Sequence, residues 1–314
     1  MLTRAQIRNK VRNKPWVTPF DKIIAVCDEK NKLIQIYEDH AHSKCYGAAA
    51  WSAYHYKRTS RLVVDAWRDG PRDIFMLKIG KGKLKLVPSF SSGGIEQAEI
   101  SGNECRITYA GLAGAGVGVT MCRGLAKGVK GVEIIEEGGG NKLGKAILIL
   151  PKMVKIHIGI DDTDRSDAGA TWSLANEIGV KVAEKKCIEY INHTLVQLFP
   201  MAPNKTKNCV ATVLTFAVQP DKKETLIKSV SKLLKRETLS RDTGIAVFEG
   251  IKIPNQLTKF ADKVRSKLIS VEDTLKFADK YSIELIEITG EAGLVGAAGA
   301  LGYAERHEEA VKLP

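Results

Sequence analysis

The sequence predicts a mixed α/β protein of two domains, and three observations lead to this expectation. The 314-residue chain is too long for one small hydrophobic core. Short apolar runs typical of strands dominate the first half, whereas strands and amphipathic helices alternate in the second half. Pro151 and Lys152 separate the halves. We therefore expect a sheet-rich α+β domain over residues 1–150 and an α/β domain over residues 151–314.

The composition restricts the class of protein. A net charge of +12 can attract the phosphate groups of nucleic acid, nucleotides or phosphorylated coenzymes. The alternative is that the charge keeps the protein soluble or pairs it with an acidic protein partner. No apolar run approaches the roughly 18 residues of a membrane span, and the N-terminus lacks the apolar segment of a signal peptide. We expect a cytoplasmic protein without a membrane partner. The six scattered cysteines contain no CxxC pair, which favours reduced thiols over zinc or disulfides.

The first half of the sequence predicts several strands and contains two segments that allow more than one interpretation. Residues 22–37 predict a hairpin, and further strands are expected at Arg61–Trp67, Ile74–Ile79 and Lys83–Val87. The basic segment before residue 17 is interpreted as a solvated, partly frayed terminus, with a basic arm or short helix that docks on an acidic surface as the alternative. The aromatic and basic residues from 45 to 61 are interpreted as packing around a small-residue turn, with an RNA surface as the alternative.

Two glycine-rich segments each follow a predicted strand and open a predicted helix. The first contains Gly111, Gly114, Gly116 and Gly118, and the second contains Gly290, Gly293 and Gly296. Backbone amides in such loops can approach a phosphate group, although neither spacing matches a Walker loop or a dinucleotide fingerprint. Close packing of backbone against backbone is the alternative for both segments.

The centre of the chain carries the most informative stretch, VKIHIGIDDTD, at residues 154–164. Its apolar residues alternate with a period of two, so a buried strand should end in Asp161, Asp162 and Asp164. Three carboxylates within four residues repel one another unless a hard cation such as Mg²⁺ neutralises them. The alternative, capping of the following helix, would use only one carboxylate. The sequence therefore predicts a metal site at a strand end.

The pattern after this stretch places the carboxylates in a loop between a strand and a helix. The apolar positions Leu174, Ile178 and Val182 predict a helix over Thr171–Lys186. Open α/β sheets bind ligands in such loops, at the carboxyl ends of strands. The remaining expected elements are strands at Thr194–Phe199, Cys209–Val218, Ile245–Phe248 and Ile283–Ile288, with helices around Leu226–Leu234 and at Asn255–Leu268 and Val271–Tyr281.

Five blocks in the second half resemble, in the same order, the kinase-like region of the archaeal agmatidine synthetase that modifies isoleucine tRNA. They are GIDDTD, Thr171, LVQLFPMAPNKTKNCVATVLTF, IAVFEGIKIP and GEAGLVGAAGALG, spanning roughly residues 153–305. The OB-fold and zinc-ribbon parts of that enzyme have no counterpart here. The first half, including AAAWSAYHYKRTSRLVVDAWRDG, resembles the methanogenesis marker protein 11 family.

The resemblance to the synthetase implies phosphoryl transfer that depends on ATP and Mg²⁺ in a kinase-like domain. It implies Asp161, Asp162 and Asp164 as metal ligands, Thr171 as a residue that becomes phosphorylated, and Lys205 as a charge partner of phosphate. It also implies nucleotide contacts from Gly159, Thr163, Thr206, Asn208, Gly290, Gly293 and Gly296. The block NKTKNC departs from the family, which has Gly before Asn, so Asn208 need not occupy the family position.

Two functions therefore stand side by side. The first is an ATP-dependent transferase or ligase whose acceptor is an RNA base, a peptide of the methane-forming enzyme or a coenzyme. The second is a nucleotide- or RNA-binding assembly or maturation factor without turnover of its own.

Overall fold

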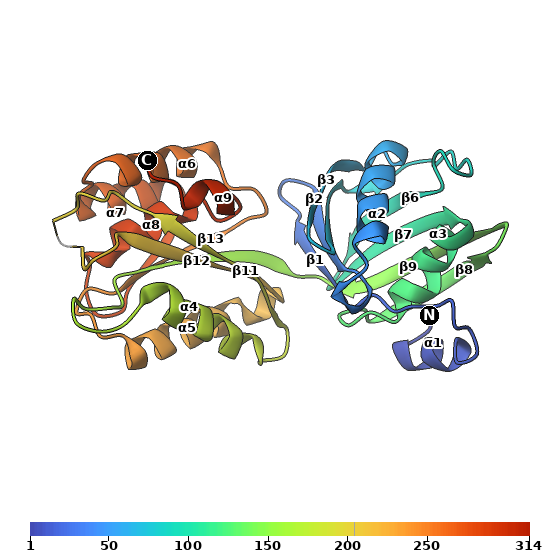
Figure 1. Cartoon of the computed structure of the whole chain (residues 1–314), viewed down its shortest axis with the longest axis horizontal. Coiled ribbons are helices and arrows are strands. Elements are labelled where there is room, and N and C mark those ends of the chain that lie inside the picture. Colours follow the sequence, from blue (N-terminus) through green and yellow to red (C-terminus); the bar gives the residue numbers. More distant parts are fainter. Residues whose placement is uncertain (204) are drawn as a thin grey trace. The chain divides into compact units, whose positions relative to one another are not determined.

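The computed structural model describes residues 1–203 and 205–314. Within it the chain forms two compact units, Met1–Met153 and Val154–Pro314 (Figure 1). Each unit contains its own sheets, helices and buried apolar residues. In the described part of the chain, no helix combines the length and the apolar composition that crossing a bilayer would need.

The N-terminal unit is built on two antiparallel sheets. One has the strand order β1-β2-β4-β3 and the other has the order β5-β6-β7-β9-β8. The elements are α1 (Arg4–Lys10), β1 (Lys22–Asp28), β2 (Leu33–Asp39), α2 (Tyr46–Thr59), β3 (Val63–Asp69), β4 (Arg72–Lys78), β5 (Gly80–Lys81), β6 (Gly93–Ser101), β7 (Glu104–Leu112), α3 (Ala113–Val117), a π-helical segment (Gly118–Cys122), β8 (Gly131–Gly139) and β9 (Lys142–Pro151).

Several local expectations for this unit need correction. The aromatic segment forms the helix α2 rather than a turn, and it buries Tyr56 in the core of the unit. Residues 83–87 form no strand, whereas β6 follows where none was expected. The basic terminus is not frayed. Its helix α1 begins with a capping box between Thr3 and Gln6, and Ile7 is fully buried.

The C-terminal unit contains one five-stranded sheet with the order β11-β12-β10-β13-β14. Its elements are β10 (Val154–Asp161), α4 (Thr171–Ala183), β11 (Ile188–Gln197), β12 (Val210–Val218), α5 (Lys223–Glu237), β13 (Gly244–Glu249), α6 (Asn255–Ser266), α7 (Val271–Lys280), β14 (Glu284–Glu287), α8 (Gly293–Leu301) and α9 (His307–Ala310).

Every strand pair of this sheet is antiparallel, whereas the open α/β sheets with which the sequence pattern was compared are mostly parallel. The central strand β10 nevertheless lies between β12 and β13 and ends at Asp161, so the carboxylates lie at the start of the loop between this strand and α4, as expected. The helices α4 and α5 cover one face of the sheet, and α6, α7 and α8 cover the other (Figure 1).

The alternation along β10 decides what each face packs against. Ile156, Ile158 and Ile160 point to the core beneath α4 and α5. Gly159 points to α8, where a β-carbon would overlap the carbonyl oxygen of Ala297. Glycine at this position therefore lets the helix α8 lie against the strand backbone, close to the end of β10.

Candidate functional site

The candidate site begins where β10 ends. Asp161 is the last residue of the strand, and its partner across β13 is Gly244. Asp162 then adopts a left-handed backbone conformation with φ of 59°, which Asp tolerates better than most residues. This turn directs the chain away from the sheet into the loop that ends at Thr171, the first residue of α4.

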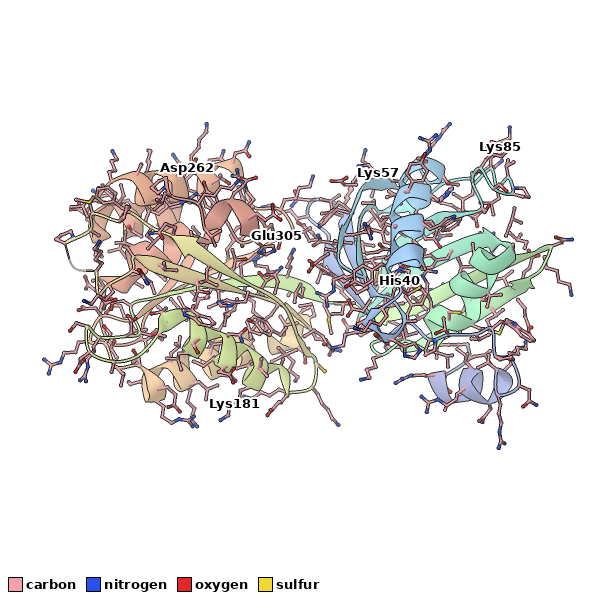
Figure 2. The ribbon with its side chains drawn as sticks, in the orientation of Figure 1. His40, Lys57, Lys85, Lys181, Asp262 and Glu305 are labelled. Atoms are coloured by element: carbon pink, nitrogen blue, oxygen red, sulfur yellow. The ribbon has the colours of Figure 1, made fainter. Side chains whose placement is uncertain are left out.

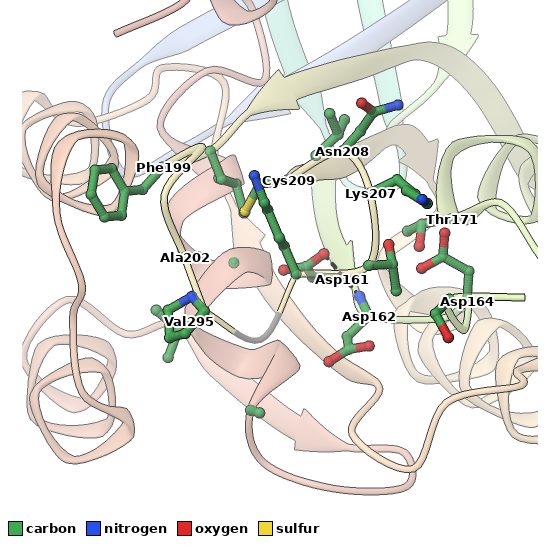
Figure 3. Close-up of a pocket in the computed structure, with 18 of the residues that line it drawn as sticks. Asp161, Asp162, Asp164, Thr171, Phe199, Ala202, Lys207, Asn208, Cys209 and Val295 are labelled. Atoms are coloured by element: carbon green, nitrogen blue, oxygen red, sulfur yellow. Dashed lines mark hydrogen bonds between the residues drawn. The ribbon is translucent and has the colours of Figure 1, made fainter.

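A cavity of about 850 Å³ opens over this strand end (Figure 3). In the view of Figure 3, Asp161, Asp162, Asp164 and Thr171 lie on one side of the cavity, and Phe199, Ala202 and Val295 lie on the other. Lys205, Thr206, Lys207 and Asn208 of the loop before β12 also line it, together with Gly296 of α8. The structure therefore brings together most of the residues that the sequence singled out.

Asp161 is the most perturbed carboxyl group of the cavity. Its desolvation inside the protein raises its pKa to about 8, and the charges of Asp162 and Asp164 act in the same direction. The amide of Asp162 donates a hydrogen bond of 2.8 Å to Oδ1 of Asp161, which opposes this shift. A cation at the cavity would stabilise the ionised form of this carboxyl group.

Asp162 is held by residues far away in the sequence. Ser240 Oγ donates a hydrogen bond of 2.8 Å to Oδ1 of Asp162, and Thr243 Oγ1 donates one of 2.5 Å to its carbonyl oxygen. Burial raises the pKa of Asp162, as do the charges of Asp242 and Asp164, whereas the hydrogen bond from Ser240 lowers it. Two side chains thus fix both the backbone and the carboxylate of Asp162.

Thr171 is enclosed rather than freely accessible. Its hydroxyl oxygen accepts hydrogen bonds from the amide of Thr163 at 3.2 Å and from the hydroxyl of Thr163 at 3.1 Å. Only 6% of Thr171 and 2% of Thr163 is exposed to solvent. Thr163 does not line the cavity, so the structure places it behind Thr171, where it holds the start of α4 against the acidic loop.

The loop before β12 that contains Lys205 and Lys207, here called the lysine loop, lines the same cavity without contacting the carboxylates. Lys205 Nζ donates a hydrogen bond to the carbonyl oxygen of Pro200, and no ion pair joins Lys205 to a described acidic residue. Lys205, Lys207 and Asn208 are exposed, and Thr206 is half-buried. The positive charges therefore face solvent at the rim and remain available to a phosphate group.

The glycines separate into two groups. Gly296 lines the cavity, and a β-carbon there would overlap Oδ2 of Asp161. Gly159, Gly290 and Gly293 do not line it. A β-carbon at Gly290 would overlap the carbonyl oxygen of Arg241, and one at Gly293 would lie 2.6 Å from that of Asp242. These three glycines allow close backbone packing, which was the alternative interpretation, and their contact with a nucleotide stays a prediction.

Three residues of the site were not anticipated. Trp172 lines the cavity with 52% of its surface exposed, directly after Thr171. Ser240 and Thr243 reach Asp162 from the segment before β13. An exposed tryptophan beside Thr171 could have been noticed in the sequence, but no local signal marks Ser240 or Thr243.

The cavity suits a hard divalent cation that is bound by one or two carboxylates, rather than by the three that the sequence predicted. Among the described residues, Asp161, Asp162 and Asp164 do not bring three ligand oxygens within 4.8 Å of one another. Mg²⁺ is usually held by one or two carboxylates together with substrate phosphates and water. Asp161 suits that mode of binding, because its carboxylate is buried, is repelled by the neighbouring carboxylates and lies in a cavity large enough for phosphates and water.

Comparisons with known proteins identify relatives of the C-terminal unit and of the whole chain. The TiaS TCKD domain family matches residues 157–226. The isoleucine-tRNA 2-agmatinylcytidine synthetase TiaS of Pyrococcus horikoshii is 31% identical over 159 residues, which cover 47% of this chain and 35% of that enzyme. The corresponding enzyme of Thermococcus sibiricus is 30% identical, over 48% of this chain and 36% of that enzyme. The chain thus spans about a third of the length of these synthetases.

A crystal structure of TiaS in complex with an isoleucine tRNA and ATP aligns with 48% of this chain and 36% of the other, with 25% identity and a TM-score of 0.43. A further relative matches almost from end to end. It is the uncharacterized protein MJ0921 of Methanocaldococcus jannaschii, which is 46% identical over 294 residues, covering 94% of this chain and 97% of the relative. The chain therefore belongs to the same family as this protein, and its C-terminal unit contains a region similar to the TiaS TCKD domain.

Proposed function

We propose that the C-terminal unit is an independent domain that binds ATP with Mg²⁺ and transfers a phosphoryl group, or activates an acceptor by doing so. The observation that carries the proposal is the convergence of Asp161, Asp162 and Asp164 with Thr171 and the lysine loop on one cavity. Phosphoryl transfer requires positioning and charge neutralisation more than covalent chemistry from the protein. The similarity of residues 157–226 to the TiaS TCKD domain supports the same reaction class.

Different residues of the cavity would bind the cation, the phosphates and the adenine ring of the nucleotide. Asp161 and Asp162 would hold Mg²⁺, which when bound neutralises phosphate charge. Lys205 and Lys207 at the rim offer cations to the phosphates from another side. The exposed ring of Trp172 provides a flat surface on which an adenine ring can stack. Ser240 and Thr243 keep Asp162 in position before the nucleotide arrives.

The acceptor of the proposed reaction is an RNA base, a peptide amide or a coenzyme. Two of the relatives are named as synthetases that act on an isoleucine tRNA, which favours an RNA acceptor. The resemblance of the first half to the methanogenesis marker protein 11 family instead connects the acceptor with methane formation, either a peptide of the methane-forming enzyme or a coenzyme. The net charge of +12 is compatible with each of these partners.

A second candidate function is nucleotide binding without turnover, in an assembly or maturation factor. The enclosure of Thr171 favours it, because a residue that is 6% exposed and whose hydroxyl group is hydrogen-bonded to Thr163 is a poor phosphate acceptor. In that case the cavity would bind nucleotide as a structural ligand, and a partner molecule would associate with the loaded protein.

The substitution Asp162→Asn tests the proposal. Asparagine keeps the size of the side chain, tolerates the left-handed backbone and still accepts the hydrogen bond of Ser240, so only the charge is removed. We expect Mg²⁺-dependent ATP turnover to fall about a hundredfold or more, with an unchanged circular dichroism spectrum. The matched control is Asp221→Asn, an exposed carboxylate outside the cavity. Equal turnover in wild type and Asp162→Asn would contradict the proposal, whereas Mg²⁺-dependent ATP binding without turnover would select the second function.

A further inference from the structure

The N-terminal unit contains a cavity of its own, with a volume of about 730 Å³. The walls are mostly apolar and include the rings of Trp16, Phe20, Trp51 and Tyr56. Cavities of this size, lined by aromatic side chains and a few polar groups, are typical of small-molecule sites. One wall includes Gly118, where the π-helical segment Gly118–Cys122 begins, and such segments occur frequently at functional sites.

Glycines keep this cavity open although the fold does not require them. No described atom lies within 4 Å of a β-carbon at Gly114, and at Gly118 the nearest is a guanidinium nitrogen of Arg123 at 3.8 Å. Both residues line the cavity, and neither has a left-handed backbone. Glycine costs stability within a helix. A β-carbon would meet no clash at either position, so close packing does not explain the two glycines.

His40 lines this cavity, and one of its ring nitrogens contacts a carboxylate. Its Nε2 lies 2.8 Å from Oδ2 of Asp73, and both residues are buried, with exposed fractions of 3% and 0%. Figure 2 shows His40 within the N-terminal unit, whereas Lys57 and Lys85 project from its surface. A carboxylate beside Nε2 places the proton of the neutral imidazole on that nitrogen. The other nitrogen, Nδ1, then carries the lone pair of the ring and can accept a hydrogen bond.

The guanidinium of Arg123, which lines the cavity, is already paired with a carboxylate, and this disfavours an anionic ligand. Arg123 donates from Nε and Nη2 to the two carboxylate oxygens of Glu38, at 2.8 and 2.6 Å. The hydroxyl of Tyr109 donates to Glu38 as well, at 2.8 Å. Glu38, His40 and Asp73 bring three ligand atoms within 4.8 Å, but these contacts occupy Glu38, so a metal would have to displace Arg123. The cavity therefore offers aromatic surface, the ring of His40 and the hydroxyl groups of Thr18 and Ser52, and the guanidinium of Arg123 is paired with a carboxylate.

We propose that this cavity binds an uncharged aromatic or heteroaromatic compound that donates a ring N–H or O–H group to Nδ1 of His40. The flat compound would lie among the rings of Trp16, Phe20 and Trp51. This site is separate from the nucleotide cavity of the other unit, and it does not depend on the function proposed there.

The experiment compares two probes of nearly the same shape by calorimetry and ligand-observed NMR on the whole protein. Indole carries one ring N–H donor, and benzofuran replaces that group with an oxygen atom. Measurements at pH 8 keep Asp73 ionised, because burial raises its pKa only to about 6. We expect saturable binding of indole, roughly fivefold tighter than that of benzofuran, as the loss of one buried hydrogen bond predicts. Inorganic phosphate should not bind or compete.

Variants locate the binding. Gly118→Leu should fill the cavity and abolish indole binding, and Gly114→Leu should act similarly from the rim. The matched control is Gly47→Leu, a glycine of α2 that also has no described atom within 4 Å of its β-carbon but lies outside the cavity. Thermal melting identifies any variant that fails to fold, and the probe comparison on the wild type needs no variant. Equal affinity for the two probes, displacement of indole by phosphate, or full binding by folded Gly118→Leu would each overturn the proposal.

Discussion

Gly296 and Asp161 face each other so closely that a β-carbon at position 296 would overlap Oδ2 of the aspartate. The glycine belongs to α8 and the carboxylate to the end of β10, two elements that pack directly on each other. The carboxylate of Asp161 therefore has room in the cavity only because Gly296, in a helix near the C-terminus, has no side chain.

The first prediction follows from this contact. Gly296→Ala should displace the carboxylate of Asp161 and lower the affinity for ATP with Mg²⁺ at least tenfold, although alanine forms helices better than glycine. Overpacking should lower the free energy of unfolding by about 1–3 kcal/mol. Calorimetric titration and chemical denaturation measure the two effects. Gly47→Ala serves as the control because its β-carbon meets open space. Wild-type affinity in Gly296→Ala would show that the carboxylate does not contribute to binding.

The second prediction concerns protons released when Mg²⁺ binds. Because the pKa of Asp161 is raised to about 8, this carboxyl group is mostly protonated at pH 7 without a cation. Binding of Mg²⁺ requires the ionised form, so about one proton should leave per ion at pH 7. Titrations in buffers of different ionisation enthalpy measure this number. The variant Asp161→Asn should bind more weakly and release none, and a heat independent of the buffer in wild type would argue against Asp161 as a ligand.

The third prediction separates the structural and the chemical role of Thr171. Thr171→Ala removes the acceptor for the amide and hydroxyl of Thr163, and should lower the free energy of unfolding by about 1–2 kcal/mol. Thr171→Ser keeps the hydroxyl group and should retain most of the stability. Intact mass after incubation with ATP and Mg²⁺ then shows whether this position gains a phosphate group. A mass increase that persists in Thr171→Ala would assign the modification to another residue.

The fourth prediction is a pH dependence of stability that comes from His157. This residue is fully buried between Thr215 and the carbonyl of Gly250, and burial, assisted by the charge of Lys155, lowers its pKa to about 4. The unfolded chain takes up a proton near the ordinary pKa of 6.5, before the folded protein does. The contribution of His157 to stability is therefore present above about pH 6.5 and is lost as the pH falls towards 4.

The variant His157→Gln, which cannot titrate, isolates this contribution. Other groups, including Asp161, titrate in the same range, so the quantity to compare is the difference in unfolding free energy between wild type and variant. That difference should decrease by on the order of 3 kcal/mol between about pH 7 and pH 4. Urea denaturation at several pH values measures it, and a constant difference would show that folding does not lower the pKa of His157.

The sequence by itself determined the local features of the site. The alternation of isoleucines with a period of two predicted β10, and the adjoining run of Asp161, Asp162 and Asp164 predicted a metal site at its end, where these residues line a cavity. These features could be predicted because residues close in sequence alone decide which side chains share a face of a strand. The helix beginning at Thr171 followed from its apolar spacing in the same way.

Only the tertiary structure decided which distant residues complete the sites. The antiparallel strand order, the approach of Gly296 to Asp161, and the hydrogen bond from Ser240 across 78 residues to Asp162 have no local signature. The same holds for the ion pair of Arg123 with Glu38 in the other unit. Such contacts form because packing whole sheets and helices buries the most apolar surface, and that optimum is a property of the entire fold.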